Sequence, residues 1–304
     1  MGNGIHSAIY GHRAWSGFLL PMILSEARWI TVEIGESARD VLSRLPENCA
    51  DFFFHVNLTY SARIPLGRRE LVVELRSRGI TVWNAEMHDM SKRTVQEICA
   101  RAGVPPVSAP VHGDPGELLV VKTNCNYHGV RENELTVRQR SMLGYESPSR
   151  MPPDRAAAEY RVTRRDQIAP EVWNSPHWVV ERYVTNAADR FHRVYLAGRS
   201  LVVSRVFDAS VFKKMPVGIE RESWFLPTAE AASRAGVPAD VGQVAAIAAR
   251  VARTARIDYG AFDVVGDDDG GFYLIDINTT PSWGDGGHPD LLAFLGQGLA
   301  GARS

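Results

Sequence analysis

The sequence lacks the features of a secreted or membrane-bound protein. Its 304 residues include only three cysteines, spaced too widely for a disulfide framework or a four-ligand zinc site. No apolar run approaches the ~18–20 residues that a membrane helix needs. The run 15–24 is short and is followed by Glu26 and Arg28, so we expect a buried helix there. We also expect no signal peptide, because a basic n-region and a small-residue cleavage site are not seen. We therefore expect a reduced, cytoplasmic protein outside the membrane.

There is also no excess of charge of either sign. Lysine and arginine total 34 against 35 aspartate and glutamate residues, for a formal net charge of -1. No overall field attracts nucleic acid or an anionic membrane, so local groups must hold any anionic ligand. The composition, 45% hydrophobic and 23% charged, is that of an ordinary globular enzyme. The length allows two or three packed lobes.

The first part of the chain alternates between strand and helix patterns. Short β-rich runs predict strands, and apolar residues at helical spacing predict helices between them. Gly79 ends the second helix, as glycine often does. This alternation implies a small parallel sheet with helices on its faces. The predicted strands are 7–10, 30–34, 51–58 and 80–84, and the helices are 37–45 and 68–78.

Beyond residue 90 the predicted elements are fewer and longer. Apolar residues share one face of a helix at 91–102 and of another at 240–256. The segment 124–153 is rich in Asn, Arg, Ser and Pro, and we expect a mobile loop in it. The other predictions are strands 118–123 and 178–184, a hairpin over 193–206 that turns at 197–199, a hairpin over 261–278 and a short helix at 289–295.

The hairpin 261–278 carries a cluster of oxygen ligands. Its turn, 266–271, separates two strand-like runs and places Asp263 directly opposite Asp276. Opposed residues have Cβ atoms ~4.5–5.5 Å apart, so two carboxylates there repel each other unless a cation lies between them. Asn278 points to the same face and adds a neutral oxygen. This set suits Mg²⁺ with phosphates in the remaining positions. The alternative is a half-exposed strand pair with no ligand.

At this hairpin the sequence resembles the ATP-grasp superfamily, which includes glutathione synthetase and ribosomal-protein glutamate ligase. The family pattern is an aspartate on one strand, then Glu-x-Asn on the returning strand and a proline-containing loop. Here these positions are Asp263, Asp276, Asn278 and Pro281, with Asp276 in place of the usual glutamate. The shorter side chain leaves open whether one or two Mg²⁺ ions bind. The resemblance extends over residues 83–287.

The resemblance implies an α/β chain with the ATP-grasp fold. We expect an N-terminal parallel-sheet β/α domain at 1–86, a central ATP-grasp lobe at 87–179 and a C-terminal lobe at 180–304. ATP and Mg²⁺ are the implied ligands, with two lysines at the phosphates, a hinge strand at the adenine edge and two arginines at the reacting groups. The residues assigned in this way to the nucleotide are Lys92, Lys122, Glu181, Arg182, Tyr183, Val184 and Asp189, and those assigned to catalysis are Arg193 and Arg205. Lys213 and Lys214 are further candidates on the substrate side.

One segment departs from the family pattern. A loop rich in glycine and serine usually follows the central lysine and closes over the phosphates with its backbone amides. Here the loop reads Asn-Cys-Asn-Tyr-His-Gly over 124–129, with a single glycine. Cys125 and His128 could form a nucleophile pair, but the sequence offers no third residue to orient them.

The implied reaction is ligation of a carboxylate to an amine of an amino acid or short peptide, with release of ADP and phosphate. Two alternatives stay open: a phosphotransferase that acts on a small hydroxyl substrate, and a nucleotide-binding protein without catalysis. The expected partners are small-molecule carboxylate and amine substrates, without nucleic acid or membrane. A homodimer is one option for the assembly.

Overall fold

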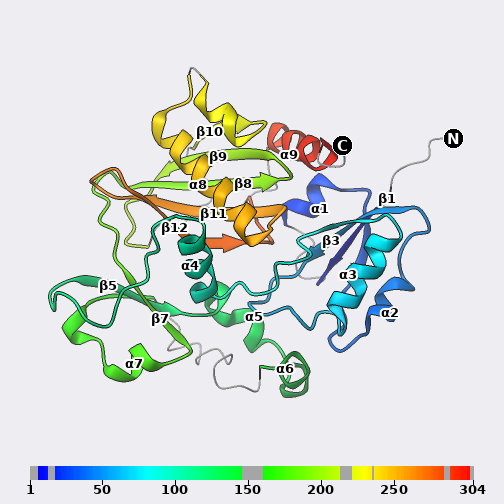
Figure 1. Ribbon diagram of the computed structural model, residues 1–304, viewed down its shortest axis with the longest axis horizontal. Coiled ribbons are helices and arrows are strands. Elements are labelled where there is room, and N and C mark those ends of the chain that lie inside the picture. The colour runs from blue at the N-terminus through cyan, green and yellow to red at the C-terminus, as the bar shows by residue number, and fades with distance from the viewer. Residues whose placement is uncertain are drawn as a thin grey trace.

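The computed structural model describes residues 6–12, 18–145, 160–212, 221–234, 236–283 and 288–301. In this part of the chain, three separate sheets are joined and covered by helices (Figure 1). None of the described helices is both long and apolar enough to cross a membrane.

The first sheet is parallel, as the β/α alternation predicts. Its order is β2-β1-β3-β4, formed by β1 (His6–Gly11), β2 (Arg28–Thr31), β3 (Cys49–His55) and β4 (Thr81–Trp83). The helices α1 (Leu19–Ile23), α2 (Ala38–Leu42) and α3 (Arg68–Ser77) alternate with these strands.

The strand β3 is buried on both faces, as strands of parallel sheets usually are. Phe52 and Phe54 face a core of this domain, whereas Phe53 faces the other way and stacks on Trp83 with ring centroids 5.1 Å apart. That second core also contains Tyr195 and Tyr259 of the C-terminal lobe. The first sheet is therefore packed directly against that lobe.

The second sheet is small and antiparallel. Its order is β6-β5-β7, from β6 (Arg161–Arg164), β5 (Leu118–Thr123) and β7 (Trp178–Arg182). The connection from β5 contains η2 (Asn126–Gly129), α5 (Val130–Asn133) and α6 (Val137–Leu143), and α7 (Pro170–Asn174) precedes β7. The sequence predicted β5 and β7 but not β6 or these short helices.

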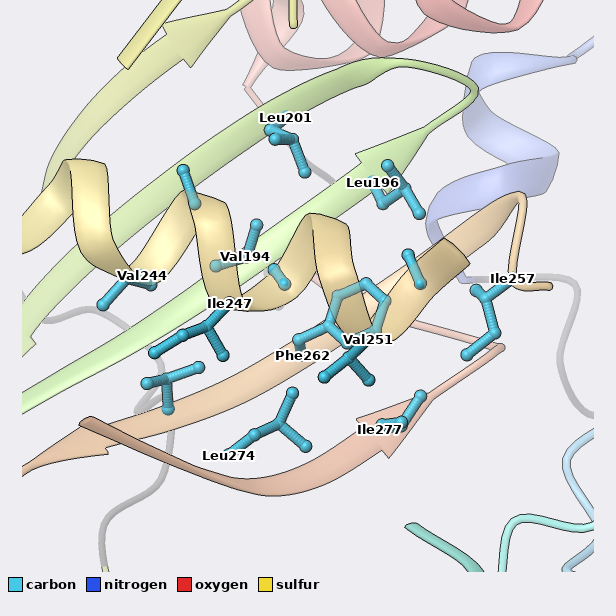
Figure 2. Close-up of a cluster of buried hydrophobic side chains, with 14 of the residues drawn as sticks. Val194, Leu196, Leu201, Val244, Ile247, Val251, Ile257, Phe262, Leu274 and Ile277 are labelled. Carbon is cyan, nitrogen blue, oxygen red and sulfur yellow. The ribbon is translucent and has the colours of Figure 1, made fainter. Parts of the chain in front are cut away.

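The third sheet is antiparallel and has five strands in the order β10-β9-β8-β11-β12. The side chains of α8 (Ala239–Ala255) pack on one face of it, on residues such as Val194, Phe262 and Leu274 (Figure 2). The other face meets α9 (Pro289–Gly301), which is longer than the predicted 289–295. The strands are β8 (Arg190–Ala197), β9 (Ser200–Phe207), β10 (Glu222–Leu226), β11 (Tyr259–Gly266) and β12 (Phe272–Asn278).

The helix α4 (Lys92–Arg101) links the lobes. Ser91 caps its first turn by accepting the Thr94 amide. Val95, Ile98 and Cys99 of α4 share a hydrophobic core with α8 and the third sheet. The domain boundaries at 86 and 179 stay a prediction.

Candidate active site

The two antiparallel sheets and segments of the N-terminal domain line one cavity of about 510 Å³. Phe18 and Asn57 line it from the N-terminal domain, strands β5, β7, β8, β11 and β12 supply about half of the other residues, and connecting segments supply the rest. Nine of the residues assigned in the sequence to the nucleotide, to catalysis or to the metal lie in its wall: Lys122, Glu181, Arg182, Tyr183, Val184, Arg193, Asp263, Asp276 and Asn278.

Three neighbouring strands of the third sheet, β8, β11 and β12, bring a row of charged side chains together. Arg193 of β8 lies directly opposite Asp263 of β11, and Asp263 lies directly opposite Asp276 of β12. The second pairing confirms that Asp263 and Asp276 oppose each other, although the residues nearer the turn pair one position away from the predicted register. Beyond Asp263 the register shifts by one residue, which leaves Ile275 as the extra residue of a β-bulge. Because a bulge changes where its side chains point, Ile275 and Asp276 both reach the cavity.

Each carboxylate of this row holds a cation. Arg193 donates to Asp263 through Nε at 2.6 Å and Nη2 at 2.7 Å, a bidentate pair. Lys92 Nζ lies 2.5 Å from Asp276 Oδ1. Burial alone would lower the pKa of Arg193, but the Asp263 carboxylate raises it, so the guanidinium stays charged. The row therefore consists of a cation, two carboxylates and a second cation, and its net charge is zero.

A third ion pair lies deeper in the cavity. Lys122 Nζ is 2.6 Å from Glu181 Oε2 and donates to the Ile275 carbonyl at 3.3 Å. Both side chains are buried, and burial raises the pKa of Glu181. The other Glu181 oxygen, Oε1, is buried and has no hydrogen-bond partner in the described part of the chain. A buried acceptor without a donor is unusual, so this oxygen is available to a ligand.

Lys92 does not line the cavity. It is the first residue of α4, its side chain is 1% exposed, and its ammonium is held by Asp276. The assignment of Lys92 to the nucleotide stays a prediction. Lys92 can contact a phosphate only if Asp276 releases its ammonium group.

The hinge after β7 offers fewer free amides than the sequence suggested. The Arg182 amide donates to the Val107 carbonyl at 2.7 Å, and the Tyr183 amide donates to Leu118 at 3.1 Å. These two amides are therefore not free for an adenine edge. The Val184 amide makes no such bond to another described residue, so it is the free donor of the hinge.

The carboxylates fit a hard cation, whereas the amide oxygen of Asn278 is already used. Asn278 Oδ1 accepts the Thr280 amide at 2.8 Å and its hydroxyl at 3.1 Å. The assignment of Asn278 as a metal ligand stays a prediction, and it requires Thr280 to release this oxygen or share it with the metal. In the described segments no group of three His, Cys, Asp or Glu residues could hold a metal. Asp263 and Asp276 remain, and Mg²⁺ is commonly bound by one or two carboxylates together with substrate phosphates.

Arg205 is not at this site, which corrects the sequence assignment. It pairs with His192 across β8 and β9, and successive side chains of a strand point to opposite faces, so Arg205 and Arg193 diverge. Its guanidinium instead binds Glu222 at 2.6 Å and Asp240 at 2.7 Å.

Three further sequence candidates are not among the described residues of the cavity wall. Asp189 is absent from the cavity wall, which contains Asn186 instead. Lys213 and Lys214 fall outside the described residues.

The glycine-poor loop does line the cavity, and its backbone is unusual. Tyr127 (φ 46°), His128 (φ 57°) and Gly129 (φ 73°) are left-handed in succession. Two residues with side chains thus take a conformation that favours glycine. Burial raises the pKa of Cys125 to about 12, which opposes a role as a thiolate nucleophile.

Several cavity residues were not singled out as site residues in the sequence. They come from segments without a local motif, and only the three-dimensional arrangement places them together: Phe18, Asn57, Asn126, Tyr127, Arg131, Tyr160, Asn186 and Phe212.

Comparison with known proteins identifies the fold. No protein-family model matches the chain, and no curated protein matches it. Among solved structures, it is similar to the ATP-grasp ligase PsnB complexed with a precursor variant, Mg and ADP, at a TM-score of 0.54 and 13% identity over 100% of both chains. It is also similar to D-alanyl-alanine synthetase A from Vibrio cholerae, at a TM-score of 0.51 and 12% identity over 100% of this chain and 99% of that one. The D-cycloserine synthetase DcsG gives a TM-score of 0.51 and 13% identity over 98% of this chain and 100% of that one.

The chain therefore has the ATP-grasp fold, as the resemblance implied. The mixed α/β architecture, with one parallel and two antiparallel sheets, agrees with that prediction. Identities of 12–13% establish the fold alone.

Proposed function

We propose that this chain is an ATP- and Mg²⁺-dependent ligase that joins a carboxylate to an amine and releases ADP and phosphate. The observation that carries the proposal is the row of Arg193, Asp263 and Asp276 in the wall of one cavity, with the buried Lys92 bound to Asp276 at the end of the row. Two opposed carboxylates and two cations are the groups needed to bind a metal–polyphosphate complex. The solved ligases of similar fold support the same reaction class.

Nucleotide binding would exchange the partners of these ion pairs. Asp263 and Asp276 would hold Mg²⁺, which when bound neutralises phosphate charge and orients the phosphates. Arg193 and Lys92, released from their carboxylates, would then face the phosphate oxygens, and Lys122 would contact them from β5. Because the charges balance before and after, no cation is left buried without a partner.

The adenine would lie along β7, where the structure leaves two groups free. The Val184 amide can donate to a ring nitrogen, and Glu181 Oε1 can accept from an amino group. The side chains of Val120 and Ile275 give this end of the cavity an apolar wall. This arrangement distinguishes adenine from bases without an amino group at that edge.

The reaction itself needs positioning and charge neutralisation from the protein. An oxygen of the substrate carboxylate attacks the γ-phosphorus, the bond to the β,γ-bridging oxygen breaks, and ADP leaves. The amine then attacks the carbonyl carbon of the acylphosphate, phosphate leaves, and the nitrogen loses a proton. Arg193 is placed to stabilise the charge that develops on the transferring group.

The test is an ADP-release screen in which pairs of amino acids and small carboxylic acids are supplied with Mg-ATP. The expected result is ADP and free phosphate that depend on both co-substrates, with a product whose mass equals the sum of the two minus water. Phosphate retained on a single hydroxyl substrate would establish the phosphotransferase instead. ATP binding without turnover on any pair would favour the non-catalytic alternative. Asp276→Ala serves as the inactive control.

A further inference from the structure

A second cavity, of about 770 Å³, lies apart from the candidate active site. It is lined by Leu196 and Leu201, which face the core under α8, and by the end of α8. Arg193 belongs to the opposite face of the same sheet, so the two cavities lie on opposite sides of it. The N-terminal domain closes the second cavity with Arg76 and Glu86.

Four arginines from three separate segments line this cavity. Arg76 comes from α3, Arg199 from the turn between β8 and β9, and Arg253 and Arg256 from the end of α8. Arg76 is paired with Glu86 at 3.2 Å. The other three guanidinium groups make no hydrogen bond or ion pair within the described segments.

The acids of the cavity do not balance these cations. The acids that line it are Glu86, Glu230 and Asp258, three against four arginines. Glu86 is paired with Arg76, and Asp258 accepts the Asn84 amide at 2.8 Å. The cavity therefore carries an excess of positive charge on a chain whose net charge is -1.

The backbone at Arg256 is a second, independent observation. This residue ends α8 in the left-handed conformation, with φ 54°. Helices commonly end in that conformation on glycine, since a side chain there is sterically strained. Strained positions of this kind cluster at functional sites. Here the strained position places a guanidinium at the cavity wall.

We propose that this cavity binds a small multivalent oxyanion, held by Arg199, Arg253 and Arg256. Guanidinium forks match both phosphate and carboxylate oxygens, so a compound with two or more such groups is the class of ligand that fits. All three arginines belong to the C-terminal lobe, whereas Arg76 of the N-terminal domain lines the same cavity but is paired with Glu86. The helix dipole favours positive charge at the carboxyl end of α8, which is a sufficient reason for Arg253 and Arg256 to be there without a ligand. It gives no such reason for Arg199, which lies in the turn between β8 and β9.

The test is calorimetric titration of the full chain with pyrophosphate and, separately, with citrate, at constant ionic strength. We expect saturable binding of at least one anion at one site. Binding of pyrophosphate alone identifies a phosphorylated ligand, and binding of citrate alone identifies a polycarboxylate. Arg199→Gln, Arg253→Gln and Arg256→Gln should each weaken it by about tenfold, the effect of losing one charge-assisted contact.

Two control variants separate this site from its surroundings. Arg250→Gln removes an exposed arginine of the same helix that does not line the cavity, and it should leave the affinity unchanged. Lys122→Gln, in the other cavity, removes a residue of the proposed nucleotide site; it should leave unchanged the part of the binding that the three arginine variants weaken. The proposal is overturned if neither anion binds, if the three variants bind like the wild type, or if only Lys122→Gln abolishes binding. It does not depend on the ligase reaction.

Discussion

Lys92 and Asp276 lie 184 positions apart in the chain, yet they form an ion pair in which Nζ is 2.5 Å from Oδ1. The lysine begins α4 and the aspartate lies beside the bulge of β12, so the pair fixes one end of the helix on the hairpin. The same ammonium keeps Asp276 neutralised where it faces Asp263. A metal that takes Asp276 must displace Lys92, and that exchange links metal binding to phosphate binding.

This linkage predicts how Mg²⁺ affects ATP binding. In the wild type, Mg²⁺ should tighten the binding of a non-hydrolysable ATP analogue. In Asp276→Asn the carboxylate is gone and Lys92 is already free, so the variant should lose most of the Mg²⁺ effect, a change of about tenfold or more. Titration of the analogue with and without Mg²⁺ measures it. Asp269→Asn, in the exposed turn, is the matched control. An unchanged Mg²⁺ response in Asp276→Asn would show that the metal does not use this carboxylate.

A second prediction concerns Glu132, which is buried near the loop of the site. Its Oε1 accepts the Thr59 amide at 2.7 Å and the Tyr145 hydroxyl at 3.4 Å, and its Oε2 has no hydrogen-bond partner in the described segments. Burial raises the pKa of Glu132 above its ordinary value of 4.5. The folded state therefore holds this proton more tightly than the unfolded chain, so its contribution to stability is complete below pH 4.5 and falls as the pH rises through the folded pKa.

Urea denaturation between about pH 5 and 8 tests this dependence. Glu132→Gln cannot ionise, so its stability relative to the wild type should increase with pH, by up to about 1.4 kcal/mol per pH unit below the folded pKa. Glu134→Gln alters an exposed neighbour that pairs with Arg131 and should show no such slope. A constant difference between Glu132→Gln and the wild type across this range would contradict a raised pKa.

The left-handed backbone at Tyr127 gives a third prediction. Tyr127 is 58% exposed, so little packing is lost when its side chain is removed. Glycine accepts φ 46° without strain, whereas alanine keeps the Cβ atom that opposes it. Tyr127→Gly should therefore be more stable than Tyr127→Ala by about 1 kcal/mol. The free energy of unfolding of both variants gives the comparison. If alanine is equal or better, the loop is not left-handed at this residue in solution.

The sequence predicted the elements of the site better than the side chains that meet there. The pairing of Asp263 with Asp276 was predicted correctly, but the turn alone does not produce it: next to the turn Val264 pairs with Leu274, and the extra residue Ile275 then brings Asp276 opposite Asp263. No pattern in the neighbouring residues of the sequence indicates the bulge at Ile275 or the ion pair between Lys92 and Asp276. They depend on how α4 packs against a hairpin far away in the sequence.

Arg205 was assigned by resemblance, and the hairpin of β8 and β9 shows why it does not share a face with Arg193. A three-residue turn at 197–199 pairs residue 191 with 205 and puts Arg205 on the same face as Arg193. The observed loop has two residues and pairs Ala197 with Ser200, so His192 faces Arg205 instead. A shift of one residue moves every side chain of the strand to the other face. The separation of the two arginines follows from that single residue.

A last prediction tests the close packing of α9 on the hairpin of β8 and β9. A Cβ atom built on Gly298 would lie 2.4 Å from the Ala197 carbonyl oxygen and 2.7 Å from the Ser200 Cβ. Neither atom can move without shifting the strand, so Gly298→Ala should lower the free energy of unfolding by about 1–3 kcal/mol. Gly296→Ala is the matched control in the same helix. Its Cβ would meet only Ile23, at 3.4 Å, so the better helix propensity of alanine should raise stability by about 0.5–1 kcal/mol. Urea denaturation should therefore give shifts of opposite sign, and equal shifts would exclude a close contact between α9 and Ala197.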